Sequence, residues 1–300
     1  MISRTEPGWK RVWRQSAPHR AGFAFILPVL VLFLLFRVWP AIDGLLLSFQ
    51  DFRMRGGSTW IGFQNFRELW DDKVFWGSLR VTLTYALISV PLATIAAVAM
   101  ALLIDRAIRG IAWFRAIYFL PYITSFVMVA VIWSWIYRTN DGLLNGLLDL
   151  VGIGPIPWLT SESHVLPSLA IMSVWKGVGY SMMILLAGLR AIPASLGEAS
   201  AVDGASGAQT FWRITLPLLK PVLFFVIVIE TIGSFQVFDA IFVMTGGGPV
   251  RASYSLVYML YDESFKFQNY GYAAAIGVVL FLMTFTVTMV QRLMFGRGDA

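Results

Sequence analysis

The sequence predicts an all-α, polytopic membrane protein with six transmembrane helices, because it is very apolar, poor in charge and divided into long apolar segments. Hydrophobic residues make up 58% of the 300 residues and charged residues 13%, and the mean hydropathy is +0.71. Soluble domains average about 45–50% apolar and about 25% charged residues. A water-soluble chain this apolar would expose aggregation-prone patches. The composition therefore argues against a water-soluble enzyme, a nucleic-acid binder and a disordered scaffold.

Six segments qualify as membrane spans, because a helix needs roughly 20 mainly apolar residues to cross the hydrocarbon core. They cover residues 21–42, 81–104, 111–137, 167–189, 221–244 and 272–295. Together they predict a membrane domain of residues 21–295, with an N-terminal tail of residues 1–20 and a C-terminal tail of residues 296–300.

The basic residues predict how these spans are oriented. Six spans place both termini on one side of the membrane, and more of the loop-borne basic residues lie on that side than on the other. Several of them precede the first span: Arg4, Lys10, Arg11, Arg14 and Arg20. Because cytoplasmic loops are enriched in Lys and Arg, both termini are expected in the cytoplasm. The net charge of +6 then reflects topology, and no nucleic-acid partner is expected.

Two outer loops have distinctive compositions. Residues 43–77 are rich in aromatic residues, and we interpret them as an aromatic belt with short surface helices, in preference to a partner-docking surface. The glycine-rich stretch 245–249 lacks the Gly-Lys-Ser/Thr ending of a phosphate-binding loop. It is expected to be a flexible turn, and no ATP site is predicted in the chain.

The reactive residue types are scarce. The chain has no cysteine and two histidines, which are His19 and His164. Disulfides, thiolate metal sites and cysteine nucleophiles are therefore excluded. Because the two histidines are far apart in sequence, no metal site is predicted, and no catalytic residues are assigned in this chain.

The loop between the fourth and fifth spans, residues 190–220, has the most specific pattern. Ser195 and Glu198 have the spacing of a capping box that starts a short helix. Gly204 can close that helix in a left-handed conformation. Ser206 and Gln209 have the same capping-box spacing and predict a second short helix.

The loop is therefore expected to be a helix–turn–helix bracket that projects from the membrane. Pro217 and Pro221 mark the point where the fifth span begins after the second short helix. Small side chains on the first helix and in the turn permit close approach of a partner: Ala199, Ala201 and Ala205. On spacing alone, it is equally plausible that Glu198 and Gly204 only shape the bracket.

The residues of this bracket resemble the EAA loop of ABC-importer permease subunits. The run Glu198-Ala199-Ser200 is followed, after three residues, by Gly204, and after nine more by Ile214-Thr215-Leu216-Pro217. All spacings match the family pattern, and Ser200 in place of the second alanine is the one departure. Serine is small enough to keep the close packing, so little loss of function is expected.

Weaker motifs extend the resemblance over nearly the whole chain. Residues 61–66, 119–122, 141–145 and 245–249 are similar to the carbohydrate-uptake branch, which includes maltose-type and glycerol-phosphate-type permeases. The resemblance implies the type I ABC-importer permease fold and a place in a bacterial cytoplasmic (inner) membrane. It also implies that the bracket is a coupling helix, which docks in a cleft of a cytoplasmic ATPase subunit through Glu198, Ala199, Ser200, Asp203 and Gly204.

The resemblance further implies the partners. They are a second, homologous permease subunit, two ATP-binding cassette subunits and an extracytoplasmic substrate-binding protein, besides the membrane lipid. ATP and Mg would be bound by the ATPase subunits, so this chain is expected to carry no cofactor and not to be an enzyme.

Polar groups at membrane depth are costly and are functional candidates by default. Lys176 in the fourth span and Glu230 in the fifth are candidates for an intramembrane ion pair, which could be structural or line the pathway. Sugars bind to aromatic faces and hydrogen-bonding groups, so we take the substrate-pathway candidates from both spans: Trp175, Tyr180, Glu230, Ser234, Gln236, Phe238 and Asp239. If the fifth span is one continuous helix, Gln236 and Asp239 share one face and Glu230, Ser234 and Phe238 share another.

The sequence thus predicts the permease subunit of an ATP-driven importer that translocates a carbohydrate, such as a disaccharide, an oligosaccharide or a polyol. The same machinery importing glycerol 3-phosphate or a glycerophosphodiester is the nearest alternative. A secondary transporter or channel is more distant, because neither needs a cytoplasmic bracket of this kind. A membrane-embedded enzyme would need clustered catalytic groups, which the intramembrane residues Lys176 and Glu230 do not supply.

Overall fold

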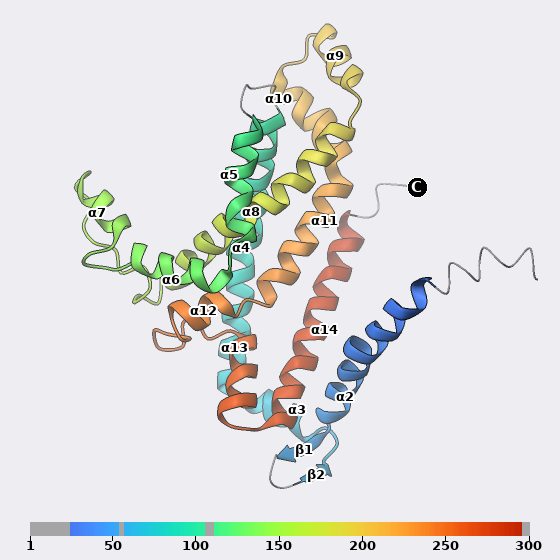
Figure 1. Ribbon diagram of the computed structural model, residues 1–300, viewed down its shortest axis with the longest axis vertical. Coiled ribbons are helices and arrows are strands. Elements are labelled where there is room, and N and C mark those ends of the chain that lie inside the picture. Colours follow the sequence, from blue (N-terminus) through green and yellow to red (C-terminus); the bar gives the residue numbers. More distant parts are fainter. Residues whose placement is uncertain (1–24, 54–56, 106–110, 296–300) are drawn as a thin grey trace, which may run out of the picture.

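The computed structural model describes residues 25–53, 57–105 and 111–295 as an elongated array of helices (Figure 1). Within these residues, several helices are long and apolar enough to cross a membrane: Phe25–Leu47, Lys73–Asp105 (α4), Val165–Ala191 (α8), Gly207–Phe235 and Tyr270–Phe295 (α14). A bent pair, α5 (Ile111–Ile123) and α6 (Phe126–Ile136), supplies a sixth span if it is counted as one. The predicted class, a helical membrane protein, is confirmed, and the described residues supply five spans, or six with the bent pair counted as one. The tails 1–20 and 296–300 lie outside the described residues.

Shorter elements join these helices. The N-terminal helix includes the π-helical segment η1 (Leu34–Val38) and α2 (Trp39–Leu47). The remaining elements are β1 (Gln50–Arg53), β2 (Gly57–Trp60), α3 (Gln64–Asp71), α7 (Leu143–Asp149), α9 (Ala194–Val202), α10 (Gly207–Thr210), η2 (Phe211–Thr215), α11 (Leu216–Phe235), α12 (Asp239–Met244), α13 (Leu256–Tyr261) and η3 (Asp262–Lys266). In Figure 1, α9 and α10 lie at one end of the array and the β1–β2 hairpin lies at the opposite end.

The third span is broken, whereas the sequence predicts one helix over residues 111–137. The axes of α5 and α6 differ by 106°. Pro121 cannot donate a backbone hydrogen bond, and Ser125 has an extended ψ of 132°. The Thr124 hydroxyl donates to the Leu120 carbonyl at 2.9 Å. Hydropathy does not predict this break, because the apolar content of a segment is the same whether its helix is continuous or interrupted.

The fifth span also differs from the predicted helix over residues 221–244. The helix α11 ends at Phe235, and after a non-helical stretch the chain continues in α12. Phe238 has a φ of −137°, outside the helical range. The helix also begins earlier than predicted, because α10, η2 and α11 form one continuous run, Gly207–Phe235. Pro217 lies inside this run, in the first turn of α11.

Three clusters of buried side chains hold the array together. One joins α4, α8 and α11 near the bracket end, where α4 presents Ala97 and Ala101 four residues apart, both fully buried. Small residues at this spacing allow helices to approach closely in a membrane. A second cluster joins α4, α6, α8 and α12, and includes Tyr85 and Leu169. A third joins α3, α13 and α14 at the end opposite the bracket.

The loop predicted as aromatic, residues 43–77, contains an antiparallel hairpin as well as the helix α3. The all-α prediction is therefore incomplete at this point. The buried Asn65 side chain donates to the carbonyls of Ser48 and Gln50 at 2.9 and 3.0 Å, which ties α3 to the end of the first span. Ring contacts of Phe49 with Trp60 and Phe63 cover the hairpin.

The glycine-rich turn 245–249 is held more firmly than its composition suggests. Gly246 and Gly247 have φ values of +57° and +84°, which glycine adopts without steric cost. The Ser253 hydroxyl donates to the Gly248 carbonyl at 2.6 Å, and the Gly246 amide donates to the Ile241 carbonyl at 2.8 Å. These hydrogen bonds support a defined conformation of the turn.

Candidate functional site

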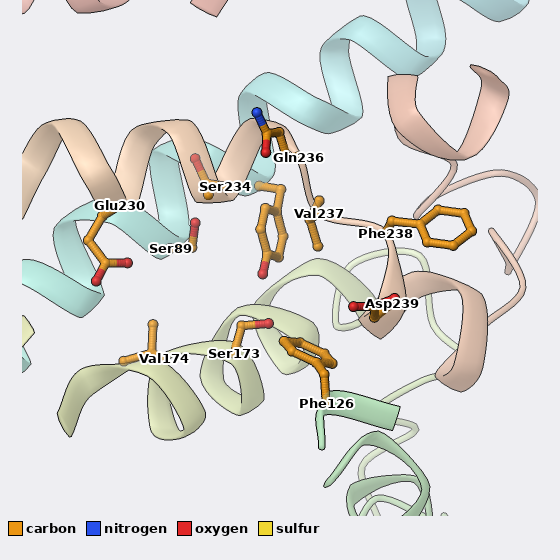
Figure 2. A pocket seen from close by; sticks show the side chains of 12 residues that line it. Ser89, Phe126, Ser173, Val174, Glu230, Ser234, Gln236, Val237, Phe238 and Asp239 are labelled. Carbon is orange, nitrogen blue, oxygen red and sulfur yellow. The ribbon is translucent and has the colours of Figure 1, made fainter. Parts of the chain in front are cut away.

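A polar cavity of about 210 Å³ lies between the two helix breaks, where α4, α6, α8 and α11 meet. Its lining combines hydroxyls, carboxylates, an amide and aromatic rings: Tyr85, Ser89, Phe126, Ser173, Val174, Glu230, Gly233, Ser234, Gln236, Val237, Phe238 and Asp239. Figure 2 shows Glu230 and Asp239 at opposite ends of this lining, with Ser89, Ser173 and Phe126 between them. The cavity therefore offers hydrogen-bonding groups beside aromatic surface at membrane depth.

Five of the seven predicted pathway residues line this cavity: Glu230, Ser234, Gln236, Phe238 and Asp239. The sequence places them on two different helix faces, of which only one could face a pore. Because α11 ends at Phe235, residues after it are no longer bound by helical spacing, and both sets reach the same cavity. The break in the chain thus brings together residues that a continuous helix would separate.

The other two pathway candidates lie elsewhere. Trp175 is 46% exposed, and its ring packs against Trp133 with ring centroids 5.5 Å apart. Tyr180 stacks on Tyr122 of α5, with ring centroids 4.8 Å apart and planes 10° from parallel. Neither residue contributes to the lining of the polar cavity.

Several lining residues are absent from the sequence-based set. Tyr85 and Ser89 come from α4 and are four residues apart, so they share a helix face. Their polar groups at membrane depth could have marked the second span as a contributor. Phe126 follows directly on the break between α5 and α6, and no sequence pattern indicated that this break would place it here.

The predicted ion pair between Lys176 and Glu230 is absent from the part of the chain that the structure describes. The Lys176 ammonium donates instead to the backbone carbonyl of Tyr122 at 3.1 Å, and Glu230 accepts a hydrogen bond from the Ser181 hydroxyl. Each member of this candidate pair has another polar partner instead: Lys176 in the broken span, and Glu230 on α8. Within the described residues, no group of three or more His, Cys, Asp or Glu side chains could hold a metal ion.

The bracket has the predicted two-helix form, but its first helix starts differently. The helix α9 begins at Ala194, after Pro193, and has no side-chain cap. Ser195 therefore lies inside the first turn, where its hydroxyl cannot cap the helix, and the predicted box with Glu198 does not form. Gly204 follows the helix with a φ of +77°, as predicted for a left-handed closing residue.

The second helix of the bracket starts as the sequence predicts. The Ser206 hydroxyl accepts from the Gln209 amide at 3.3 Å, and the Gln209 side chain accepts from the Ser206 amide at 2.7 Å. Both hydrogen bonds of a capping box are therefore present.

Ser200, the departure from the family pattern, joins the two helices of the bracket. It is buried, its hydroxyl donates to the Gly197 carbonyl at 2.7 Å, and it lies 2.9 Å from the Thr210 hydroxyl of α10. Four of the five predicted coupling residues line one hollow of about 460 Å³ between these helices: Ala199, Ser200, Asp203 and Gly204. Glu198 lies outside this lining and is exposed.

Apolar side chains on the bracket remain uncovered. Val202, in the last turn of α9, is 88% exposed, and Trp212 of η2 is 66% exposed. Figure 1 shows this bracket standing beyond the ends of α4 and α5. An exposed apolar tip beside a hollow is typical of a surface that another protein covers.

Comparison with known proteins identifies the family. Residues 89–297 match the family described as "Binding-protein-dependent transport system inner membrane component". The chain belongs to this family. It is thus a multi-pass inner-membrane permease component, and the resemblance that the EAA pattern indicated is confirmed.

Relatives of this permease extend over nearly its whole length. The trehalose/maltose transport system permease protein MalF of Thermococcus litoralis is 34% identical over 272 residues, which cover 90% of this chain and 92% of that protein. The sn-glycerol-3-phosphate transport system permease protein UgpA of Agrobacterium fabrum is 32% identical over 271 residues, with coverage of 90% and 92%.

A solved structure supports the same fold. The permease superimposes with a TM-score of 0.82, at 25% identity, on a chain of a bacterial ABC transporter involved in the import of the acidic polysaccharide alginate. The match covers 96% of this chain and 99% of that chain. The permease therefore shares the ABC-importer fold from end to end.

Proposed function

We propose that the permease moves a carbohydrate through the cavity between α4, α6, α8 and α11. The cavity is the observation that supports this proposal: its lining combines the Phe126 ring with the hydroxyls of Ser89 and Ser173 and the carboxylate of Glu230. A sugar ring presents apolar CH groups bordered by hydroxyls, so it needs both kinds of surface. The trehalose/maltose relative supports the same substrate class.

The bracket, in this proposal, couples the spans to ATP hydrolysis in a separate subunit. Its apolar tip and its hollow would seat in a cleft of a cytoplasmic ATPase, with Ala199 and Ser200 permitting close approach and Glu198 available to pair with a basic group. Closure of two ATPase subunits would draw two such brackets together. The spans would then alternate between inward-facing and outward-facing arrangements, two global states biased by nucleotide and substrate.

The proposal includes the partners and the orientation. Two ATP-binding cassette subunits hold ATP and Mg, a second permease completes the pathway, and an extracytoplasmic binding protein delivers the substrate. The binding-protein complex of the alginate transporter, a fold relative, is consistent with the last of these. The bracket and both termini lie in the cytoplasm, as the distribution of basic residues favours.

Import of glycerol 3-phosphate by the same machinery is the second candidate. The relative named as a sn-glycerol-3-phosphate permease supports it. Both candidates use the same bracket, so only the chemistry of the cavity distinguishes them.

Reconstitution of the complete transporter with its binding protein tests the proposal. ATP hydrolysis and uptake are measured with trehalose, maltose, glycerol and glycerol 3-phosphate in turn. We expect a neutral sugar to stimulate both activities. Uptake driven by an ion gradient in the absence of ATP would contradict the proposal and select a secondary transporter.

A further inference from the structure

The charged groups that line the cavity are all acidic. Glu230 and Asp239 contribute carboxylates, and among the residues that the structure describes no Lys, Arg or His side chain belongs to the lining. Asp239 is exposed within the described structure. Glu230, at the other end of the lining in Figure 2, accepts the Ser181 hydrogen bond and leaves further acceptor capacity toward the cavity.

The nearest cation is already engaged by other groups. Lys176 is 8% exposed and donates to the Tyr122 carbonyl. Its ammonium also lies 5.2 Å from the ring centroid of Phe126 and 5.8 Å from that of Tyr122. Lys176 is not among the residues that line the cavity. The lining therefore combines two acidic side chains with no basic one among the described residues.

We propose that this cavity selects neutral, hydroxyl-rich substrates and rejects anionic ones, with Glu230 and Asp239 as the specificity-determining residues. The inference rests on the proposed function, because it assigns the substrate charge at the same pathway. Carboxylates accept strong hydrogen bonds from sugar hydroxyls. They repel phosphate, sulfonate and carboxylate groups, and this repulsion is strong where little water screens it.

Family membership does not determine this charge preference. The relatives of the permease include one named for trehalose and maltose and one named for glycerol 3-phosphate. A neutral sugar would meet hydrogen-bond acceptors in this cavity, whereas a phosphate would meet two carboxylates with no free cation among the lining residues. The lining therefore favours the carbohydrate candidate over the glycerol-phosphate candidate.

The absence of cysteine from the chain permits a direct measurement of the cavity's charge. Ser89 lines the cavity, and its hydroxyl has no hydrogen-bond partner among the described residues, so Ser89→Cys breaks no hydrogen bond within them. The full chain carrying Ser89→Cys is placed in nanodiscs. It is then labelled with trimethylammonium-ethyl methanethiosulfonate, a cation, or with sulfonatoethyl methanethiosulfonate, an anion. In each case the thiolate attacks the reagent's sulfur, a disulfide forms and methanesulfinate leaves.

Each labelling rate is divided by the rate of the same reagent with a free small thiol, which removes intrinsic differences between the reagents. We expect the cation to be favoured over the anion by about tenfold or more at Ser89→Cys, and by much less at Val202→Cys on the exposed bracket tip. Adding Asp239→Asn or Glu230→Gln should reduce the preference several-fold in each case. An equal or anion-favouring ratio at Ser89→Cys would overturn the proposal.

Protection by ligands separates this inference from the proposed function. Methyl glucoside and glucuronate share a ring but differ in charge, and each is added before a small uncharged thiol reagent. We expect only the glucoside to slow labelling of Ser89→Cys. Equal protection by both ligands would leave the carbohydrate pathway in place and overturn the charge selection. Protection by neither would contradict the pathway itself, and the selection with it.

Discussion

The side-chain ammonium of Lys176 lies 3.1 Å from the backbone carbonyl oxygen of Tyr122, which belongs to a different helix. Tyr122 is in the last turn of α5, directly before the chain turns by 106° into α6. The carbonyls at a helix end have no partner within the helix, and a membrane offers little water to replace one. Lys176 therefore stabilises the break from the neighbouring helix, since a cation at a helix C-terminus also interacts favourably with the helix dipole.

Lys176→Met should weaken this break. The Tyr122 carbonyl would lose a charged donor, which costs about 1–3 kcal/mol, and the thermal unfolding midpoint should fall by a few degrees. Spin labels at single cysteines on α5 and α6 should show a broader distance distribution. Lys176→Arg keeps a cationic donor and serves as the control, and an unchanged distribution in Lys176→Met would contradict the assigned role.

Two neighbouring glycines on α8 give a matched pair of substitutions. A Cβ at Gly179 would overlap the backbone of Tyr118 on α5, whereas a Cβ at Gly177 would meet nothing within 4 Å. Gly179→Ala should push the two helices apart and lower the unfolding midpoint. Gly177→Ala should be neutral or stabilise the helix by up to about 1 kcal/mol. Equal effects of the two substitutions would show that α5 does not pack on α8 at Gly179.

The contact between Ser200 and Thr210 can be measured by a double-mutant cycle. The two hydroxyls are 2.9 Å apart and join the helices of the bracket. Ser200→Ala and Thr210→Val should each reduce stability, with a coupling energy of about 0.5–1 kcal/mol between them. Because alanine is the family residue at position 200, we expect Ser200→Ala to retain transport. A coupling energy of zero would mean that the hydroxyls do not interact.

Stability should depend on pH through Glu263, in η3 outside the spans. Burial, followed by the nearby charge of Asp72 and then of Asp262, raises the pKa of Glu263 above its ordinary value of 4.5. A raised carboxyl pKa contributes stability that is fully present below the unfolded pKa and is lost as pH rises through the folded pKa. Glu263→Gln should therefore raise the unfolding midpoint at neutral pH and reduce its decline between mildly acidic and neutral pH. A wild-type midpoint that rises with pH across this range, with no gain in Glu263→Gln, would refute the effect.

The existence of the spans could be predicted from sequence, because the length of an apolar segment largely determines the free energy of placing it in lipid as a helix. The breaks could not be predicted, because each depends on contacts between helices. Pro121 alone is compatible with a continuous helix. The break is stabilised by Lys176, which lies 54 positions from Tyr122 in sequence, and one sequence does not reveal that pairing.

The candidate sites also combine features that the sequence predicts with features that it does not. Gly204 was predictable because a left-handed backbone strongly favours glycine, and the structure gives it a φ of +77°. The box of Ser195 and Glu198 was not predictable, because its spacing fits several helix starts and the N-cap is Pro193, two residues before Ser195. Tyr85 and Ser89 could not be assigned to the cavity from the sequence. A polar residue inside a span can be recognised as costly to bury in lipid, but the sequence does not show in which direction its side chain points.

One measurement tests most directly whether the bracket transmits the state of the ATPase to the cavity. Ser89→Cys is labelled in the assembled transporter, with its ATPase subunits and binding protein, without nucleotide and with a non-hydrolysable ATP analogue. The labelling rate should change at least several-fold on nucleotide binding, and Gly197→Ala, a bracket substitution with nothing within 4 Å of its Cβ, should preserve the change. Gly204→Val, which strains the turn of the bracket, should abolish the change while leaving the nucleotide-free rate intact. The coupling would be contradicted if nucleotide did not change the labelling rate of Ser89→Cys with the unaltered bracket. It would also be contradicted if the labelling rate in the Gly204→Val variant changed with nucleotide as it does without that substitution.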